Sequence, residues 1–219
     1  MSSVDWSRVR AVLFDAVGTV IHPFPTVVET YHAAAMRFGS RLPPDVIRSR
    51  FAAAFARQTL DEPTNEAREL ERWRTIVGAV IDDVGVNADD LFDHLWHGFA
   101  SANSWRMFAD VPEAIAVVQR HGLRCGIASN FDARLRTVVA GHPPLAALEL
   151  FVSSELGFSK PARGFFTAVE SRLQLPPEAI LLLGDDLQND VEGARAAGWQ
   201  ALHLDRAAGG TLTDLLRRV

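Results

Sequence analysis

Residues 11–20 read AVLFDAVGTV, an apolar run that reaches one carboxylate, Asp15, and continues through a Gly-Thr pair. A short apolar run that stops at such a break is typical of a strand buried on both faces of a parallel sheet. In open α/β folds ligands bind at the carboxyl ends of the strands, so Asp15 lies where chemistry is usually done. Taken alone, an Asp in this place is as readily a turn residue, and its role depends on the rest of the chain.

Beyond residue 107 the sequence alternates between short apolar runs and amphipathic segments. The apolar runs predict strands at 123–128, 150–153, 179–183 and 201–204. The segments between them predict helices over 110–121, 132–139, 165–173, 190–197 and 211–218. We expect Asp110 to cap the first of these helices and Pro143-Pro144 to form a turn. This alternation predicts right-handed βαβ units, and hence an α/β fold with a doubly wound, Rossmann-like parallel sheet.

A long stretch between the first strand and this part has no convincing strand. Residues 21–25 are predicted to be a connection, because their two prolines fit neither a central strand nor a helix interior. Four runs of apolar residues then recur at helical spacing, starting near Val27, Ile47, Leu70 and Leu91. Their aromatic residues are expected to form core rather than a ligand site. We therefore expect a core domain of residues 1–21 and 107–219 and an all-helical cap domain of residues 22–106.

Composition narrows the kinds of partner. The 219 residues carry a formal net charge of −5 without a Lys/Arg cluster, which argues against nucleic-acid binding. No run of about 18 apolar residues suggests a membrane span, and the first ten residues lack the apolar segment of a signal peptide. The single cysteine, Cys125, lies in an apolar run and is expected to be a small buried hydrophobic residue. A cytoplasmic protein is therefore expected, and no pattern in the sequence reports its oligomeric state.

Polar groups follow four of the predicted strands. They are Asp15, the pair Ser129-Asn130, the loop containing Lys160, and the pair Asp185-Asp186. Because the carboxyl ends of parallel strands lie on one edge of the sheet, these groups are expected to meet in one crevice. A carboxylate, a hydroxyl, an ammonium and a further carboxylate pair are the groups that nucleophilic attack on a phosphoryl centre requires.

In such a reaction Asp15 would be the nucleophile and would form an acyl-phosphate. The backbone N–H groups that follow it, at Ala16 and Val17, would hold the phosphoryl oxygens together with Ser129 and Lys160. Asp15 and Asp185 would hold a hard cation such as Mg²⁺, which prefers oxygen ligands.

Four short motifs in this order resemble those of the haloacid dehalogenase superfamily, in particular the dehalogenase-like hydrolase branch of its helical-cap subfamily. Residues 14–19 (FDAVGT) are similar to the nucleophile loop, 128–130 (ASN) to the hydroxyl motif, 160–161 (KP) to the basic motif, and 184–190 (GDDLQND) to the acidic loop. Each motif is short, but four in order at strand ends form a specific signal. The resemblance implies that the helical insertion is a cap that closes over the site and selects the substrate.

The resemblance also implies a set of metal ligands. Asp15 would bind the metal as well as act as nucleophile, with the main-chain carbonyl of Val17 and the carboxylate of Asp185 as further ligands. Asp186 has two possible roles, as an additional metal ligand or as a cap for the helix that follows.

A second set of residues would bind the phosphoryl group. Ser129, Asn130 and Lys160 would bind its oxygens, and Asp190 would orient Lys160 or a metal-bound water. For Ser129 there is an alternative interpretation, in which its hydroxyl only caps the next helix.

One residue departs from the family pattern. Phosphatases of this family usually carry a second Asp two residues after the nucleophile as general acid and base, and this chain has Val17 there. General acid–base catalysis contributes about 10²–10⁴-fold, so we expect a slow Mg²⁺-dependent phosphatase of a small phosphorylated metabolite. His22 is either a substitute acid or an exposed hinge residue.

Two other functions remain open. A 2-haloacid dehalogenase also lacks that Asp, because a leaving halide needs no proton, but such enzymes bind no metal and Asp185 would repel their carboxylate substrate. Alternatively, weakened catalysis would leave a protein that binds a phosphorylated ligand or a partner protein. The substrate is not readable from the cap, where four arginines either reach the site or form solvated faces. They are Arg37, Arg41, Arg50 and Arg57.

Overall fold

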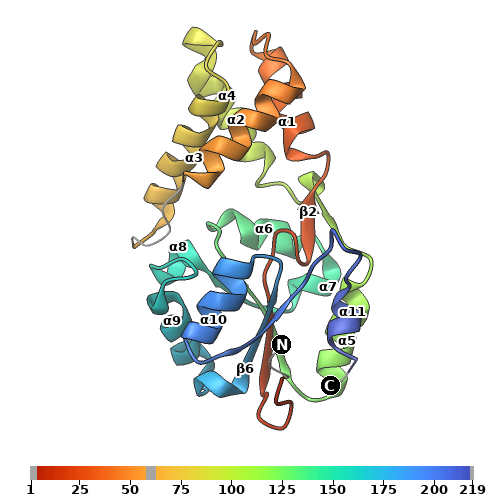
Figure 1. The fold of residues 1–219 in the computed structure, drawn as a ribbon. Coiled ribbons are helices and arrows are strands. Elements are labelled where there is room, and N and C mark those ends of the chain that lie inside the picture. The colour runs from red at the N-terminus through yellow and green to blue at the C-terminus, as the bar shows by residue number, and fades with distance from the viewer. Residues whose placement is uncertain (1–3, 58–62, 218–219) are drawn as a thin grey trace.

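The computed structural model describes residues 4–57 and 63–217, and at its centre is a five-stranded parallel sheet (Figure 1). The strand order is β5-β4-β1-β6-β7. The strands are β1 (Ala11–Phe14), β4 (Arg124–Ser129), β5 (Glu149–Val152), β6 (Ile180–Gly184) and β7 (Gln200–His203). The predicted α/β fold is confirmed. The fully buried β1 is the central strand, which places the end of the AVLF segment in the middle of the carboxyl edge.

Helices cover both faces of this sheet, as a doubly wound fold requires. Because side chains alternate along a strand, Val12 and Phe14 pack on one face, and Ala11 and Leu13 on the other. The first face carries α5 (Val111–Arg120), α6 (Arg134–Ala140), α7 (Pro143–Ala146) and α11 (Leu212–Leu215). The second carries α8 (Ser153–Leu156), α9 (Arg163–Leu173) and α10 (Gly193–Ala196).

The helical insertion between Pro23 and Trp105 contains four α-helices in its described part, as predicted. They are α1 (Val27–Arg37), α2 (Pro44–Ala56), α3 (Glu66–Val80) and α4 (Ala88–Gly98). Their apolar faces form a hydrophobic cluster separate from the two beside the sheet. Figure 1 shows them stacked on one end of the core. None of the helices in the described residues is long and apolar enough to cross a bilayer.

A small antiparallel ribbon joins the insertion to the core. β2 (Ile21–Pro23) pairs with β3 (Trp105–Met107), with Ile21 opposite Met107. The prediction that residues 21–25 form only a connection is therefore wrong for the first three. A proline is tolerated at the end of an edge strand, and three-residue strands are too short to show alternation. Single 3₁₀ turns complete the connections at Gly85–Asn87, Ala102–Ser104 and Pro177–Ala179.

Four smaller predictions need correction. The helix predicted over 190–197 begins earlier, because a π-helical turn, Leu187–Glu192, precedes α10, and its spacing differs from the helical repeat read in the sequence. Pro143 and Pro144 start α7 instead of a turn, since proline fits the first turn of a helix. Asp110 does not cap α5, because its carboxylate accepts hydrogen bonds from Arg206 and from the Leu212 N–H. The last helix ends at Leu215, and Arg218 lies outside the described residues.

Candidate active site

The centre of the site is a buried lysine held by two carboxylates. Lys160 is 1% exposed, and its Nζ donates to Asp15 Oδ1 at 2.7 Å and to Asp190 Oδ1 at 2.6 Å. A third hydrogen bond, of 2.8 Å, goes to the carbonyl of Ala128. Asp15 follows β1, Ala128 lies in β4 and Asp190 lies in the turn after β6. The ammonium therefore joins the carboxyl ends of three adjacent strands.

Burial determines the proton affinities of this cluster. It raises the pKa of the Asp15 carboxyl to about 7, and Asp190 and Asp185 add to this rise while Lys160 opposes it. Burial alone would lower the pKa of Lys160, but the carboxylates of Asp15 and Asp190 outweigh it and hold the pKa above its ordinary value. The lysine is thus a fixed cation, and full ionisation of Asp15 calls for positive charge beyond that of Lys160.

The acidic loop approaches the nucleophile loop closely. Thr19 Oγ1 donates to Asp185 Oδ1 at 3.0 Å, and Gly18 has a φ of 89°. A Cβ at Gly18 would lie 2.2 Å from Asp185 Oδ2, so only glycine leaves room for that carboxylate. Partial burial raises the pKa of Asp185 above its ordinary value, although the residue is still open to solvent.

Three carboxylates are close enough to share a cation. Asp15, Asp185 and Asp190 each offer an oxygen within 4.8 Å of the others. Asp190 is already engaged, since Oδ1 accepts from Lys160 and Oδ2 accepts from the N–H of Asp186 at 3.1 Å. Asp15 and Asp185 are then the pair that fits a divalent ion, which would offset the excess of three carboxylates over one ammonium.

The structure favours the capping reading of Asp186. Its carboxylate accepts the N–H groups of Gln188 and Asn189 at 2.9 Å each, and the Asn189 side-chain amide at 2.7 Å. These bonds satisfy the start of the π-helical turn and engage both oxygens of the carboxylate.

The residues expected to bind phosphate take different places. Asn130 bonds the Lys160 peptide from both sides, accepting its N–H at 2.7 Å and donating to its carbonyl at 2.8 Å, so it positions the lysine loop. Ser129 ends β4 and is 2% exposed, and Ala16 is fully buried beside the nucleophile. Val17 lines a cavity. Its side chain is apolar, at the position where phosphatases of the family that the motifs resemble usually have an acid.

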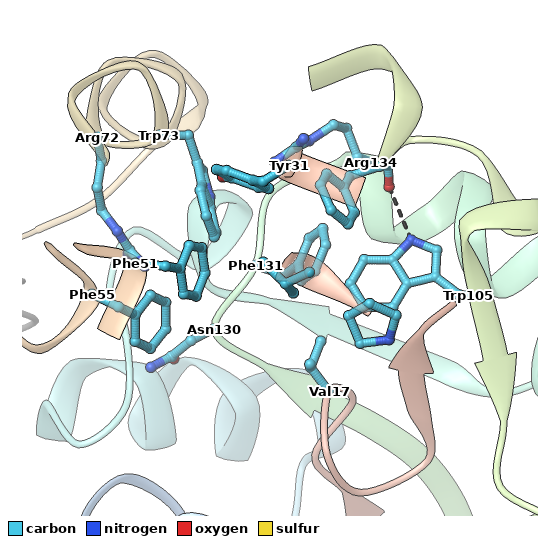
Figure 2. A pocket seen from close by; sticks show the side chains of 13 residues that line it. Val17, Tyr31, Phe51, Phe55, Arg72, Trp73, Trp105, Asn130, Phe131 and Arg134 are labelled. Carbon is cyan, nitrogen blue, oxygen red and sulfur yellow. Dashed lines mark hydrogen bonds between the residues drawn. The ribbon is translucent and has the colours of Figure 1, made fainter. Parts of the chain in front are cut away.

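This cavity, of about 220 Å³, lies between the core and the helical insertion (Figure 2). Val17 and Asn130 bring it next to the carboxylate cluster, and aromatic side chains form most of the remaining wall. The aromatic lining residues are Tyr31, Phe51, Phe55, Trp73, Phe99, Trp105 and Phe131. Tyr31, Phe51, Trp73 and Phe99 belong to the hydrophobic cluster of the insertion, as expected, and they line this cavity as well. Helical spacing shows which face of a helix is apolar but not whether that face meets another helix or a cavity.

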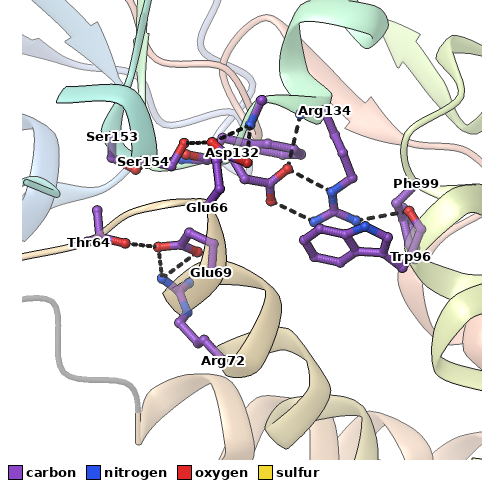
Figure 3. A network of polar contacts seen from close by, with 12 residues as sticks. Thr64, Glu66, Glu69, Arg72, Trp96, Phe99, Asp132, Arg134, Ser153 and Ser154 are labelled. Atoms are coloured by element: carbon purple, nitrogen blue, oxygen red, sulfur yellow. Dashed lines mark hydrogen bonds and ion pairs between the residues drawn. The ribbon is translucent and has the colours of Figure 1, made fainter. Parts of the chain in front are cut away.

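Two arginines line the cavity, and neither was singled out from the sequence. Arg134, in the core, is held by two hydrogen bonds of 2.7 Å to Asp132, and its guanidinium lies 3.3 Å from the centre of the Trp96 ring (Figure 3). Arg72, in α3, pairs with the buried Glu69 at 3.2 Å. The Nε–H of Arg72 is buried and has no hydrogen-bond partner among the described residues.

The side chains suggested for reaching the site from the insertion lie elsewhere. Arg37, Arg41 and Arg57 are exposed, and Arg50 pairs with Asp82 at 2.6 Å. None of these four arginines is among the described residues that line the cavity. His22 packs in the ribbon with its ring 4.8 Å from that of Phe108, and it does not line the cavity either.

Polar contacts tie the insertion to the core over this cavity (Figure 3). The carboxylate of Glu66, at the start of α3, accepts the Ala133 N–H at 3.0 Å and the Ser154 hydroxyl. On the other side, Arg134 of the core donates to the carbonyl of Trp96 in α4 at 3.1 Å. The insertion is therefore held down at two of its helices.

Comparisons with known proteins agree with this architecture. The sequence model of the haloacid dehalogenase-like hydrolase family matches residues 9–198. The chain is 27% identical over 210 residues to haloacid dehalogenase-like hydrolase domain-containing protein 3 of Danio rerio, across 92% of this chain and 87% of that protein. It is 26% identical over 221 residues to a ribulose-1,5-bisphosphate 5-phosphatase of Halopiger xanaduensis, across 93% and 88% of the two chains. The defluorinating L-2-haloacid dehalogenase Rha0230 shares the fold with a TM-score of 0.71 and 18% identity, across 90% of this chain and 82% of that one.

Proposed function

The chain belongs to the haloacid dehalogenase-like hydrolase family, and from this premise we propose that it is a Mg²⁺-dependent phosphatase of a small phosphorylated molecule. Residues 22–106 act as its cap over a core of residues 1–21 and 107–219. The relative named as a ribulose-1,5-bisphosphate 5-phosphatase supports phosphate ester hydrolysis as the reaction. Asp15 is the nucleophile, and the reaction proceeds through an aspartyl-phosphate.

The observation that carries this proposal is the charge balance around Lys160. One buried ammonium faces the carboxylates of Asp15, Asp185 and Asp190, which leaves a net negative site. A negative site would repel a phosphate unless a cation neutralises it. Mg²⁺ held by Asp15 and Asp185, with the Val17 carbonyl as a further ligand, would supply that neutralisation next to the reacting phosphoryl group.

The residues of the chain then have defined tasks. An oxygen of the Asp15 carboxylate bonds to phosphorus while the ester P–O bond breaks and its electron pair stays on the leaving oxygen. Ser129, Lys160 and the N–H groups of Ala16 and Val17 hold the phosphoryl oxygens. Asp190 keeps Lys160 pointed at Asp15. In the second step a water oxygen attacks phosphorus, Asp15 leaves as a carboxylate, and the water's proton passes to solvent.

A dehalogenase is the second candidate, and Val17 beside an apolar cavity is what favours it. Displacement of halide needs no proton donor, and the apolar wall would suit a small organic halide. Against this reading, the Asp185 carboxylate next to Asp15 opposes binding of a second anion, the carboxylate of a 2-haloacid. Phosphate chemistry with a cation accounts for Asp185, and dehalogenation does not.

The test uses acetyl phosphate, a small substrate that needs no proton donor to leave. With Mg²⁺ the protein should release phosphate, Asp15→Asn should not, and borohydride reduction should convert residue 15 to homoserine, detected by mass spectrometry. Asp186→Asn is the matched control, because this neighbouring carboxylate caps a helix. Absence of Asp15-dependent phosphate release refutes the proposal. Metal-independent chloride release from 2-chloropropionate would identify a dehalogenase, and phosphate binding without turnover a weakened, ligand-binding member.

A further inference from the structure

We propose that the substrate is a small aryl phosphate, a monoester whose leaving group is a phenol and whose ring occupies the aromatic cavity. This inference rests on the proposed phosphatase function and adds the chemical class of its substrate. Two independent features carry it, the walls of the cavity and the residue at position 17.

The cavity walls accept an apolar ring and offer little to a sugar. Several polar groups in the wall are already engaged: the Trp105 Nε1–H donates to the Phe99 carbonyl at 3.0 Å, as the dashed line in Figure 2 marks. Asn130 bonds the Lys160 peptide, and Arg134 is held by Asp132. Sugar hydroxyl groups placed against the aromatic side chains would exchange water for an apolar surface, at a cost of about 1–3 kcal/mol for each hydroxyl left without a partner.

The size of the cavity agrees with a ring. An apolar cavity of about 150 Å³ is enough to hold benzene, and this one has about 220 Å³. Drug-sized ligands occupy pockets of roughly 300–1,000 Å³, so this cavity is small for a nucleotide base with its sugar. A single substituted aromatic ring fits.

Val17 selects the same molecules by reactivity. Without a general acid the leaving oxygen departs with its electron pair and no proton. A phenolate suits this step because phenols have a pKa near 10, as in tyrosine, whereas an alkoxide approaches the basicity of hydroxide, for which water's pKa is about 15.7. The bond from Asp15 to phosphorus forms, the phosphorus–phenolate bond breaks, and the phenolate takes its proton later from solvent.

Arg72 adds a preference for one substituent on the ring. Its Nε–H is a buried donor that lacks a partner among the described residues, while its Nη1 is paired with Glu69. In Figure 2 Arg72 and Val17 lie on different sides of the cavity. A ring with its phosphate at Asp15 and an acceptor such as a carbonyl on its far side would satisfy this donor.

Three esters separate ring recognition from leaving-group chemistry. Phenyl phosphate has both the ring and a phenol leaving group, benzyl phosphate has the ring with an alcohol leaving group, and cyclohexyl phosphate has neither. We expect kcat/KM for phenyl phosphate to exceed that for benzyl phosphate by about 10² or more. Benzyl phosphate should inhibit competitively, and more strongly than cyclohexyl phosphate. Equal or better hydrolysis of cyclohexyl or glycerol phosphate would overturn the inference.

Variants of the chain give a second, independent readout. Val17→Asp should narrow the gap between phenyl and benzyl phosphate, because it returns an acid to the leaving group. Phe55→Ala should raise KM for phenyl phosphate several-fold more than KM for acetyl phosphate, whereas Phe24→Ala, equally exposed at 49% and outside the cavity, should not. Arg72→Lys keeps the charge paired with Glu69 and should reduce the preference for 4-acetylphenyl over phenyl phosphate. An unchanged set of ratios would contradict the proposal.

Acetyl phosphate keeps this inference separate from the proposed function. If acetyl phosphate is hydrolysed through Asp15 but phenyl phosphate is not preferred over the alkyl esters, the aryl class is wrong and the phosphatase stands. If the aryl and alkyl esters are not hydrolysed and acetyl phosphate is inert as well, the proposed phosphatase function itself is refuted.

Discussion

Asp15 and Lys160 form an ion pair in which burial acts against both charges and the surrounding carboxylates act in opposite directions on the two partners. Asp190 raises the pKa of the Lys160 ammonium, whereas Asp190 and Asp185 both raise the pKa of Asp15 and so oppose its ionisation. The pair is therefore complete only when further positive charge is present, as it would be with a bound cation.

This imbalance predicts a pH-dependent stability in EDTA. The pKa of Asp15 is about 7 in the folded protein and 3.8 in the ordinary carboxyl, so the folded state binds the proton more tightly. Its contribution to the free energy of unfolding is then lost as the pH rises from about 4 through 7, by a few kcal/mol at most. Asp15→Asn removes that loss.

Urea denaturation at pH 5 and pH 8 checks this expectation. The stability of Asp15→Asn relative to wild type should increase from pH 5 to pH 8 in EDTA, and Mg²⁺ should stabilise the wild type but not the variant at pH 8. A difference that is the same at both pH values would contradict the assignment of the raised pKa to Asp15.

Gly18 should be irreplaceable for two separable reasons. Ala at this position meets a φ of 89° and a Cβ 2.2 Å from the Asp185 carboxylate. Gly39 has a similar φ of 96° with nothing within 4 Å of the place a Cβ would take, so Gly39→Ala measures the backbone cost alone, about 1–2 kcal/mol. We expect Gly18→Ala to lose phosphatase activity and Mg²⁺ affinity by isothermal titration, and Gly39→Ala to retain both. Equal effects of the two substitutions would exclude the steric role of Gly18.

Helices and strands were predictable where their apolar pattern is long or unbroken. The strands lie within one residue of the predicted bounds, because each is a short apolar run between turn residues. The ribbon and the π-helical turn were missed or misplaced. Their geometry depends on partners far away in the chain. In the ribbon Ile21 pairs with Met107, and in the π-helical turn Asp190 bonds Lys160.

Capping gives a prediction about the first helix of the insertion. Thr26 accepts the Glu29 N–H at 3.3 Å, and the Glu29 carboxylate accepts the Thr26 N–H at 2.9 Å, which forms a capping box at the start of α1. Thr26→Ala should lower the free energy of unfolding by about 1 kcal/mol, measured by urea denaturation. Thr75→Ala, an exposed Thr inside α3, is the control and should cause no loss, since Ala is the better helix former. A larger loss for Thr75→Ala than for Thr26→Ala would contradict the capping role.

The arrangement of insertion and core determines the shape of the aromatic cavity, because its lining residues come from both. Glu66 links them through the Ala133 N–H and the Ser154 hydroxyl. Hydrogen bonds to a charged group contribute about 1.5–3 kcal/mol in favourable cases, so their loss should increase the undocked population by about tenfold.

Glu66→Ala is therefore expected to loosen the insertion without unfolding it. Small-angle X-ray scattering should give a larger radius of gyration, and hydrogen exchange should accelerate in the ribbon. Glu71→Ala, in the same helix with an exposed side chain, should change neither. If the two variants scatter identically to wild type, the contacts of Glu66 do not hold the insertion in place.

Local patterns in the amino-acid sequence were enough to predict the α/β core, the four helices of the insertion and the convergence of Asp15, Lys160 and Asp185 on one edge. These features follow from local patterns, since an apolar run defines a buried strand and parallel strands end on the same side. Three roles became visible only in the folded chain: Asn130 binds the lysine loop, Asp186 caps a turn, and aromatic residues of the insertion line a cavity. Such roles depend on which surfaces meet across the fold, and no spacing within one segment carries that information.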